Sequence, residues 1–257
     1  MQRRPGFPAR LDRPPAAAPA AVAAGVRVPR EAQPPMPQGV GLDSAAVRAR
    51  MVQRLAAAGI TAAPVLQAMG AVQRHGFVDS ALANQAYEET SLPIGLGQTI
   101  SKPGVVARMT ELLLGADGAR AQGLGRVLEI GTGCGYQAAV LARLAREVYT
   151  VERLRALHEK ARDNLRPLRL ANVHLILGDG MLGYAAGAPY AGIICAAGGD
   201  SLPPQWCEQL AVGGRLVAPM AGADGRQLLL VVDKTPQGLK QSVLEAVHFV
   251  PLKSGVA

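Results

Sequence analysis

The sequence is poor in cysteine and in aromatic residues, and it contains no long apolar run. Three of its 257 residues are cysteines (Cys134, Cys195 and Cys207), and aromatic residues make up 4% of the chain. The cysteines form no CxxC pair and have no histidine at ligand spacing, so we expect neither a disulfide scaffold nor a bound metal. No segment approaches the roughly 20 apolar residues of a membrane span. We therefore expect a cytoplasmic protein without a membrane partner.

The first 40 residues differ in composition from the rest of the chain. They hold six Arg against two acidic residues, a balance of +4 out of a net +8, and nine of the 19 prolines. Such a segment buries too little apolar surface to offset the entropy of ordering, so we expect a disordered tail over residues 1–42. Arg3-Arg4 resembles a twin-arginine export signal, but the apolar run at 16–25 is short and contains a proline. A flexible extension, or a start codon placed too early, fits better.

The segment after the tail favours helices and one loop. Apolar residues recur at helical spacing over 47–55 and 65–72, and a third helix is expected from Pro103 to Leu114. Between the second and third helices, SLPIGLGQTISKPG is rich in glycine and turn residues, which predicts a loop or a short hairpin.

From position 126 onward, short apolar strands alternate with helices. Strands are expected at 126–130, 147–152, 173–180, 191–197 and 214–220, and helices at 137–145, 154–165 and 203–210. This alternation is typical of a parallel sheet covered on both faces. Two late strands, 227–235 and 244–252, have no helix between them and should form an antiparallel hairpin at one side of the sheet.

The predicted fold is therefore α/β and Rossmann-like, with a mostly parallel, doubly wound sheet, a C-terminal hairpin and added N-terminal helices. We expect a single domain over residues 43–257. Its first part (43–115) would carry the helices and the QTIS loop, and its second part (116–257) the ligand-binding core and the C-terminal strands.

The segment VLEIGTGCGYQ, residues 127–137, is the clearest binding motif. A strand that runs into a glycine turn and a helix commonly holds a nucleotide-like ligand at the carboxyl end of the sheet. The spacing here is GxGxG, whereas the dinucleotide fingerprint is GxGxxG. Glu129 ends the strand, where a carboxylate would repel a pyrophosphate but could face an ammonium group, directly or through water.

Two more acidic residues end the next two strands. Glu152 is placed to bind a ribose, and Asp179, in GDG, could accept a hydrogen bond from an adenine amino group. S-adenosylmethionine carries adenine, ribose and an amino-acid moiety but no phosphate, so the three acids together predict this cofactor. The alternative is that they are ordinary polar strand ends.

The sequence also bears on the methyl acceptor. The end of the fourth strand reads CAAGGD, without the Asn/Asp-Pro-Pro-Tyr/Phe run of base-amine methyltransferases, and Cys195 does not follow a proline as a cytosine C5 nucleophile would. No His or Lys is clearly placed as a general base, and an acceptor that is already anionic at pH 7, such as a carboxylate, needs none. An RNA methyltransferase and a non-catalytic cofactor-binding module stay as alternatives. Half the positive charge lies in the tail, however, and no aromatic-basic stripe is visible.

Several segments resemble the protein-L-isoaspartate O-methyltransferase family. They are LPIGLGQTISKPGVVARMTELL, VLEIGTGCGYQAAVLA, YTVER, GDG, PYAGIICAA, GGRLVAPM and VHFVPL, from about Met51 to the C-terminus. The resemblance implies methyl transfer to the free α-carboxylate of L-isoaspartyl residues in damaged proteins, whose ester then collapses to a succinimide. The expected partners are isoaspartyl-containing proteins and peptides, with no specific nucleic acid, and the expected state is a monomer.

The resemblance also implies roles for individual residues. Ser101 matches the family's active-site serine, whose hydroxyl would hold the carboxylate in line with the sulfonium methyl group. The implied cofactor contacts are Ile100, Glu129, Gly131, Thr132, Gly133, Glu152, Asp179 and Gly180. The implied substrate contacts are Gln98, Thr99, Ser101, Val250, Pro251 and Leu252. Ser101 also precedes an apolar helix, so a helix N-cap is the other interpretation of this residue.

The chain departs from the family pattern at a few positions. These are Lys102, Cys134, Ala191 and the pair Gly198-Gly199. Lys102 could attract a carboxylate or simply stand in solvent. Ala191 opens the fourth strand, away from the expected ligand, so we expect an altered structural contact there and no loss of activity.

Overall fold

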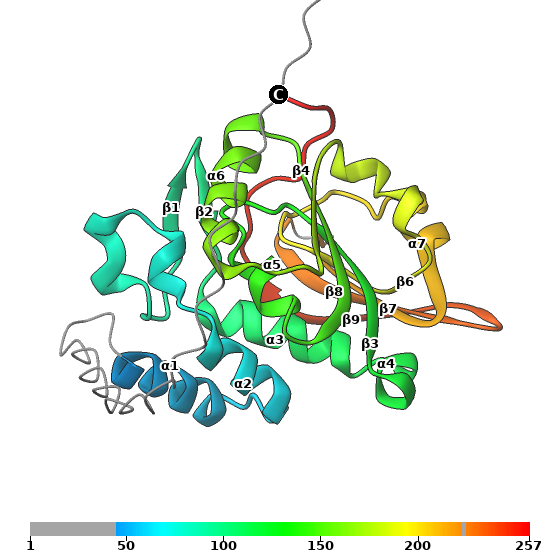
Figure 1. Cartoon of the computed structure of the whole chain (residues 1–257). Coiled ribbons are helices and arrows are strands. Elements are labelled where there is room, and N and C mark those ends of the chain that lie inside the picture. The colour runs from blue at the N-terminus through cyan, green and yellow to red at the C-terminus, as the bar shows by residue number, and fades with distance from the viewer. Residues whose placement is uncertain (1–44, 223–224) are drawn as a thin grey trace, which may run out of the picture. The chain divides into compact units, whose positions relative to one another are not determined.

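A computed structural model describes residues 45–222 and 225–257 (Figure 1). The predicted tail, residues 1–42, lies outside the described residues.

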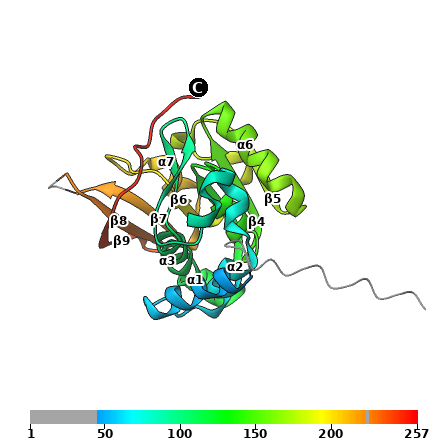
Figure 2. The ribbon, with the colours of Figure 1, turned by 90° about the vertical axis from the view of Figure 1, so that its left-hand side faces the viewer.

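A seven-stranded sheet forms the centre of the described domain. Its strands are β3 (Leu124–Ile130), β4 (Ala145–Glu152), β5 (Val173–Leu177), β6 (Tyr190–Cys195), β7 (Leu210–Ala221), β8 (Gln227–Thr235) and β9 (Gly238–Val247). They lie in the order β5-β4-β3-β6-β7-β8-β9, parallel through β7 and antiparallel in the last two strands. Figure 2 shows β5 and β9 on opposite sides of the sheet. The predicted α/β fold, with its mostly parallel sheet and C-terminal hairpin, is confirmed.

The strand order places a crevice at the end of β3. The chain runs outward from β3 to β4 and β5, then crosses back to place β6 on the other side of β3. The connections that follow β3 and β6 therefore run in opposite directions and leave a crevice between them. In open α/β sheets, ligands bind in this crevice, beyond the carboxyl ends of the strands. The glycine loop directly follows β3 and therefore borders this crevice.

Helices bury both faces of the sheet, because alternate side chains of each strand point to opposite faces. On one face, Val127 and Val148 pack with residues of α3 (Pro103–Leu114), α4 (Asp117–Gln122) and α5 (Tyr136–Leu141). On the other face, Leu128 and Val151 pack with the buried Trp206 of α7 (Pro204–Gln209). The helix α6 (Arg155–Leu165) packs beside β4 and β5.

The N-terminal region adds two helices and a hairpin. The helices α1 (Ala45–Ala57) and α2 (Ala63–Ala71) pack on α3. The strands β1 (Leu92–Gly95) and β2 (Gln98–Ile100) form a separate antiparallel hairpin that lies beside α6 in Figure 1, where Lys160 Nζ donates to the Ile94 carbonyl at 2.9 Å. This hairpin carries the QTIS segment to the crevice.

The predicted last strand, 244–252, is wrong in its bounds. β9 begins earlier, at Gly238, and ends at Val247, which pairs with Gln227, the first residue of β8. No β8 residue is left to pair with the chain beyond this point. Residues 248–257 therefore leave the ladder and run toward the crevice; we call residues 249–257 the C-terminal segment.

Several other predicted elements are shorter than expected, and three of them end or begin for a visible reason. The helix expected at 137–145 ends at Leu141, because Ala145 already pairs with Leu124 in the sheet. The strand expected at 173–180 ends at Leu177 and is followed by a 3-10 turn over Gly180–Leu182. The helix expected at 203–210 covers Pro204–Gln209, and β7 starts at the next residue.

Candidate active site

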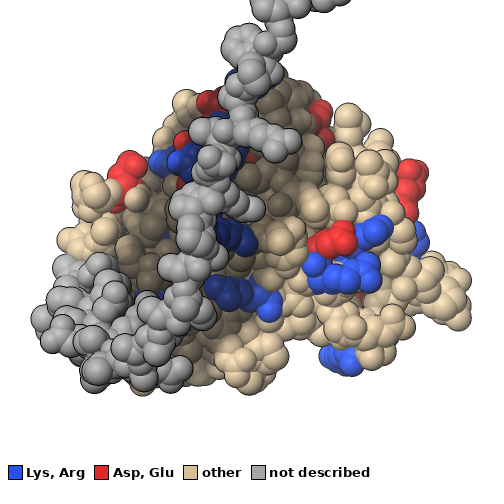
Figure 3. Space-filling view, viewed as in Figure 1, with Lys and Arg blue, Asp and Glu red and all other residues tan. Residues whose placement is uncertain are grey.

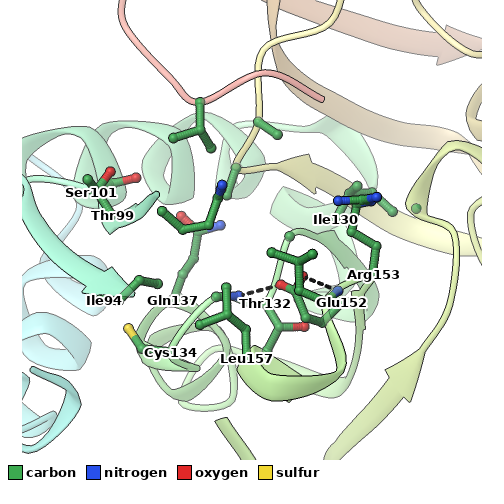
Figure 4. A pocket seen from close by; sticks show the side chains of 18 of the residues that line it. Ile94, Thr99, Ser101, Ile130, Thr132, Cys134, Gln137, Glu152, Arg153 and Leu157 are labelled. Atoms are coloured by element: carbon green, nitrogen blue, oxygen red, sulfur yellow. Dashed lines mark hydrogen bonds between the residues drawn. The ribbon is translucent and has the colours of Figure 1, made fainter. Parts of the chain in front are cut away.

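A cavity of about 410 Å³ lies beyond the carboxyl end of β3 (Figure 4). Most of its lining comes from the β1–β2 hairpin with Ser101, the glycine loop, the end of β4 with the residues after it, and the C-terminal segment. Val106 of α3, Gly180 after β5, and Ala196 and Ala197 after β6 complete it. Figure 4 shows Thr99 and Ser101 on one side of the cavity and Glu152 and Arg153 on the opposite side.

The glycine loop needs glycine for two physical reasons. Gly131, Gly133 and Gly135 have φ values of 88°, 56° and 91°, in the left-handed region that side chains other than glycine rarely adopt. A Cβ at Gly133 would also come within 3.2 Å of the Ile94 side chain, across the cavity. The loop is fastened to the sheet because the Gly131 N–H donates to the Val151 carbonyl at 2.9 Å.

Glu152 joins the end of β4 to the glycine loop. Its Oε2 accepts the Gly133 N–H and its Oε1 accepts the Leu154 N–H, both at 2.9 Å. The residue is 5% exposed and lines the cavity. A carboxylate offers about four acceptor sites, so two remain for ligand hydroxyl groups after these bonds.

Glu129 lies below the cavity lining. It is fully buried, and its Oε2 accepts a hydrogen bond from the Thr150 hydroxyl, which in turn contacts the Thr132 hydroxyl at 2.6 Å. Burial raises the pKa of Glu129 to about 8, against the opposite effect of the Thr150 hydrogen bond. The residue is not among those that line the cavity, so an ammonium group would reach it only through a neighbouring group or a water molecule.

Two buried polar atoms in this floor make no well-formed hydrogen bond within the described part of the chain. They are Oε1 of Glu129 and Nε2 of Gln137; the two side chains are near enough for Gln137 to lower the pKa of Glu129, and Gln137 lines the cavity. Unpaired buried polar atoms are costly and usually mark a place where a ligand or water completes the structure. Sequence reasoning did not select Gln137, although it lies two residues after the last glycine of the loop.

Each carboxylate oxygen of Asp179 accepts a hydrogen bond from a main-chain N–H group. Its Oδ1 accepts the Met181 N–H at 2.9 Å, which caps the following 3-10 turn, and its Oδ2 accepts the Gly255 N–H at 2.7 Å. The next residue, Gly180, lines the cavity, where a Cβ would come within 2.5 Å of the Ile130 side chain. Asp179 is therefore placed at the rim and fastens the C-terminal segment there.

Ser101 lies where two cavities meet. It lines the first cavity and also a second one of about 670 Å³, between the start of α3 and the end of β9. Its hydroxyl makes no hydrogen bond with any residue in the described ranges. The side chain is therefore free to contact a ligand.

The interpretation of Ser101 as a helix N-cap is wrong. The helix α3 begins at Pro103, Lys102 occupies the N-cap position, and no side chain of that residue caps the helix. The Gly104 N–H instead donates to the carboxylate of Glu89, at 3.0 and 3.1 Å to its two oxygens. A residue 15 positions earlier in the chain thus accepts the hydrogen bond of an N–H group in the first turn of the helix.

The remaining predicted substrate residues are brought to the same cavity. Gln98, Thr99 and Ile100 form β2, in which Ile100 is buried and pairs with Leu92. The other predicted residues are Val250, Pro251 and Leu252, which also line the cavity. The structure therefore gathers every predicted site residue at the lining except Glu129, which is buried below it, and Asp179, which lies at its rim. It also adds lining residues that sequence reasoning missed, among them Cys134, Arg153, Leu157 and Lys253.

The second cavity carries charges of both signs. Arg108 lies between Glu245, at 3.0 Å, and Glu111, at 3.5 Å. Lys102 lines the same cavity and is exposed. On the face shown in Figure 3, Lys and Arg side chains form several separate groups, with acidic side chains beside some of them.

The titratable groups that line the first cavity include no histidine among the described residues. Burial raises the pKa of Cys134 to about 11 and that of Tyr136 to about 12, so both are neutral at pH 7. Within the same ranges, no group of three or more His, Cys, Asp or Glu side chains could hold a metal ion. No described helix is long and apolar enough to cross a membrane.

The chain matches one family and close relatives over most of its length. A family model described as protein-L-isoaspartate(D-aspartate) O-methyltransferase matches residues 46–257. A protein-L-isoaspartate O-methyltransferase of Methylibium petroleiphilum is 62% identical over 221 residues, which are 85% of this chain and 81% of the relative. One of Leptothrix cholodnii is 60% identical over 228 residues, with coverages of 88% and 80%.

Two solved structures resemble the fold. A protein-L-isoaspartate O-methyltransferase superposes with a TM-score of 0.72 at 29% identity, covering 80% of this chain and 66% of that chain. A Plasmodium falciparum structure of that description, in complex with S-adenosyl-L-homocysteine, has a TM-score of 0.69 and covers 80% and 98% of the two chains. Its 23% identity makes it evidence for the fold alone.

Proposed function

The chain belongs to the protein-L-isoaspartate(D-aspartate) O-methyltransferase family, and from this premise we propose how its cavity carries out the reaction. The enzyme transfers a methyl group from S-adenosylmethionine to the free α-carboxylate of L-isoaspartyl residues in damaged proteins and peptides. The residues responsible, the cellular location and the oligomeric state are the parts that we propose.

The first cavity fits the cofactor by size and by chemistry. Its volume of about 410 Å³ lies in the range of small-molecule sites. Its glycine loop lets the main chain approach a ligand, Glu152 has acceptor sites left for two ribose hydroxyls, and Gln137 places an amide on the lining. When bound, the cofactor supplies an electrophilic methyl group on a positively charged sulfur.

We propose direct cofactor contacts from Ile100, the Gly131–Gly133 loop, Glu152 and Gly180, all of which line the cavity. The roles proposed for Glu129 and Asp179 are less direct. Glu129 would act from below through its unpaired Oε1 and its neighbour Gln137. Asp179 would reach an adenine amino group only through acceptor sites that the Met181 and Gly255 N–H groups leave free.

The free hydroxyl of Ser101 carries the assignment of the acceptor site. Because the hydroxyl has no hydrogen bond within the described part of the chain, it can donate to the isoaspartyl carboxylate without first breaking a protein contact. Gln98 and Thr99 would shape one part of the wall, and Val250, Pro251 and Leu252 another. Recognition by main-chain groups suits a substrate whose flanking side chains vary.

No general base is needed in this arrangement. The acceptor carboxylate is ionised at pH 7, and the chain's task is to orient it and to exclude water. The neutral thiol of Cys134 and the neutral phenol of Tyr136 fit a site that moves no proton.

The decisive experiment compares two peptides that differ only in one linkage. We expect the enzyme to transfer tritiated methyl groups from S-adenosylmethionine to an L-isoaspartyl peptide and not to its normal aspartyl twin. Equal labelling of the two peptides, or none of either under conditions that saturate the cofactor, would contradict the proposed function.

We further propose that the enzyme acts in the cytoplasm as a monomer. All three cysteines are free, and two of them are buried, which suits a reducing compartment. Light scattering on a sizing column at micromolar concentration would test the monomer; a mass near twice that of the chain would contradict it.

A further inference from the structure

The substrate-facing part of the C-terminal segment is held outside any continuous strand ladder. β9 leaves its partner at Val247, opposite Gln227, and the residues that follow have no remaining β8 partner. Val250, Pro251 and Leu252 nevertheless form one wall of the cavity. Some other contact must therefore set their position.

The side chain of Gln227 replaces the missing ladder partner. Its Oε1 accepts the Phe249 N–H at 2.6 Å, and its Nε2 donates to the Phe249 carbonyl at 3.1 Å. A primary amide can make such a double contact because it carries an acceptor and donors side by side, as a peptide group does. The main chain of Phe249 is thus fixed at both of its polar groups.

Gly198 holds the residues that follow Phe249. Its N–H donates to the Val250 carbonyl at 2.8 Å, and its carbonyl accepts the Leu252 N–H at 2.7 Å, a parallel bridge centred on Pro251. The side of β6 that pairs with β3 as far as Ile130 pairs here with the C-terminal segment instead. The segment therefore occupies the place that β3 would have taken had it not turned at the glycine loop.

The two holding residues are in contact with each other. A Cβ added to Gly198 would come within 2.1 Å of Gln227 Nε2 and 2.5 Å of its Cδ. The φ of Gly198 is not in the left-handed region, so the need for glycine is one of space. Gly198 thus leaves room for the amide that fixes Phe249.

We propose that Gln227 is a positioning residue for this reaction, which together with Gly198 fixes the register of Val250–Leu252 and so places the main chain that faces the substrate. The inference rests on the proposed function of that wall. Gln227 does not line the cavity and acts only through Phe249.

Gln227→Met tests the proposal, because it keeps the length of the side chain but removes the donors and the strong acceptor. We expect KM for the isoaspartyl peptide to rise about tenfold or more, as for the loss of one or two hydrogen bonds. The kcat and the dissociation constant of S-adenosylhomocysteine should stay within about threefold, because the proposed cofactor contacts are Ile100, the glycine loop, Glu152 and Gly180, and none of them is in Val250–Leu252.

Gln241→Met is the matched control. Gln241 is exposed on β9 opposite Val232, and this change should alter KM by no more than about twofold, as for an ordinary surface position. A Gln227→Met variant that melts lower than the control but keeps the wild-type KM would overturn the proposal and leave Gln227 with a purely structural role.

A double-mutant cycle tests the contact between the two residues. Gly198→Ala should raise KM in the wild type, because the new methyl group displaces the amide. The same change should add little in a Gln227→Ala background, where the displaced group is absent. Independent, additive effects would contradict the proposed unit.

Hydrogen exchange at Phe249 separates this inference from the proposed function. In the ligand-free protein, the Phe249 amide should exchange faster in Gln227→Met than in Gln241→Met, whether or not the enzyme methylates any peptide. Unchanged exchange would overturn the positioning role of Gln227 even in an active enzyme. Faster exchange in an enzyme without isoaspartyl activity would instead contradict the proposed function and leave the hold of Gln227 on Phe249 in place.

Discussion

The Ser101 hydroxyl is free to bind a ligand because another residue makes the contact at the start of α3. Its hydroxyl is unpaired within the described ranges because Glu89, and not Ser101, accepts the Gly104 N–H at the start of α3. The serine could therefore be replaced at little structural cost. This property makes it possible to test its role separately from stability.

We predict that Ser101→Ala lowers kcat for an isoaspartyl peptide about tenfold or more, because one hydrogen bond to an ionised carboxylate is lost. The melting temperature and the affinity for S-adenosylhomocysteine should barely change. Ser242→Ala, at an exposed position of β9, serves as the control. A Ser101→Ala enzyme that turns over at the wild-type rate would remove the serine from the mechanism.

Glu129 should make the stability of the ligand-free enzyme depend on pH. Its pKa is raised from 4.5 to about 8 by burial. In the unfolded chain the carboxyl releases its proton above about pH 4.5, while the folded chain keeps it until about pH 8. Its contribution to stability is therefore complete below the first value and is lost as the pH rises through this window.

We predict that Glu129→Gln gains in melting temperature relative to the wild type as the pH rises from 5 to 8, because the amide cannot ionise. Thermal unfolding of both proteins across this range, without cofactor, gives the difference directly. Glu159→Gln, at an exposed position of α6, controls for the loss of one surface carboxylate. A difference that stays constant with pH would show that Glu129 is ionised throughout.

At the scale of elements, the start of α3 depends on a side chain from outside the helix. Glu89 lies just before the β1–β2 hairpin and binds the Gly104 N–H, so it ties the hairpin end to the helix that follows Ser101. A carboxylate at this end of a helix satisfies an unpaired N–H group and interacts favourably with the helix dipole.

We predict that Glu89→Ala lowers the free energy of unfolding by about 1 kcal/mol, as for the loss of an N-cap. Turnover should fall as well, because the backbone at Ser101 loses its anchor. Glu88→Ala is the control. The Glu88 side chain is 62% exposed, and its ion pair with Arg54 is long, at 4.0 Å. Denaturant unfolding and peptide methylation should be measured on the same preparations; equal effects of the two changes would contradict a specific cap.

The whole molecule can be tested by removing its N-terminal residues. The family match begins at residue 46, and the composition of residues 1–42 predicts no core of its own. We expect deletion of residues 1–42 to leave the melting temperature and kcat/KM for an isoaspartyl peptide nearly unchanged. A clear loss of either would show that these residues contribute to the folded enzyme.

The sequence by itself determined the elements whose causes are local. The alternation of apolar strands and helices predicted the parallel sheet, and the glycines after β3 predicted the ligand loop, because periodicity and backbone freedom act within a few residues. The resemblance of short motifs then led to Ser101 and to the residues of the two cavity walls. These predictions needed no knowledge of the chain's path.

Only the tertiary structure decided where β9 ends, what caps α3 and which acids reach the cavity. Val247 ends the ladder because β8 begins at Gln227, and Glu129 is buried because the strands on both sides of it are in place. Asp179 meets Gly255 across 76 positions of sequence. Such contacts join groups that are distant along the chain, and their hydrogen bonds and desolvation exist only once the fold has brought those groups together.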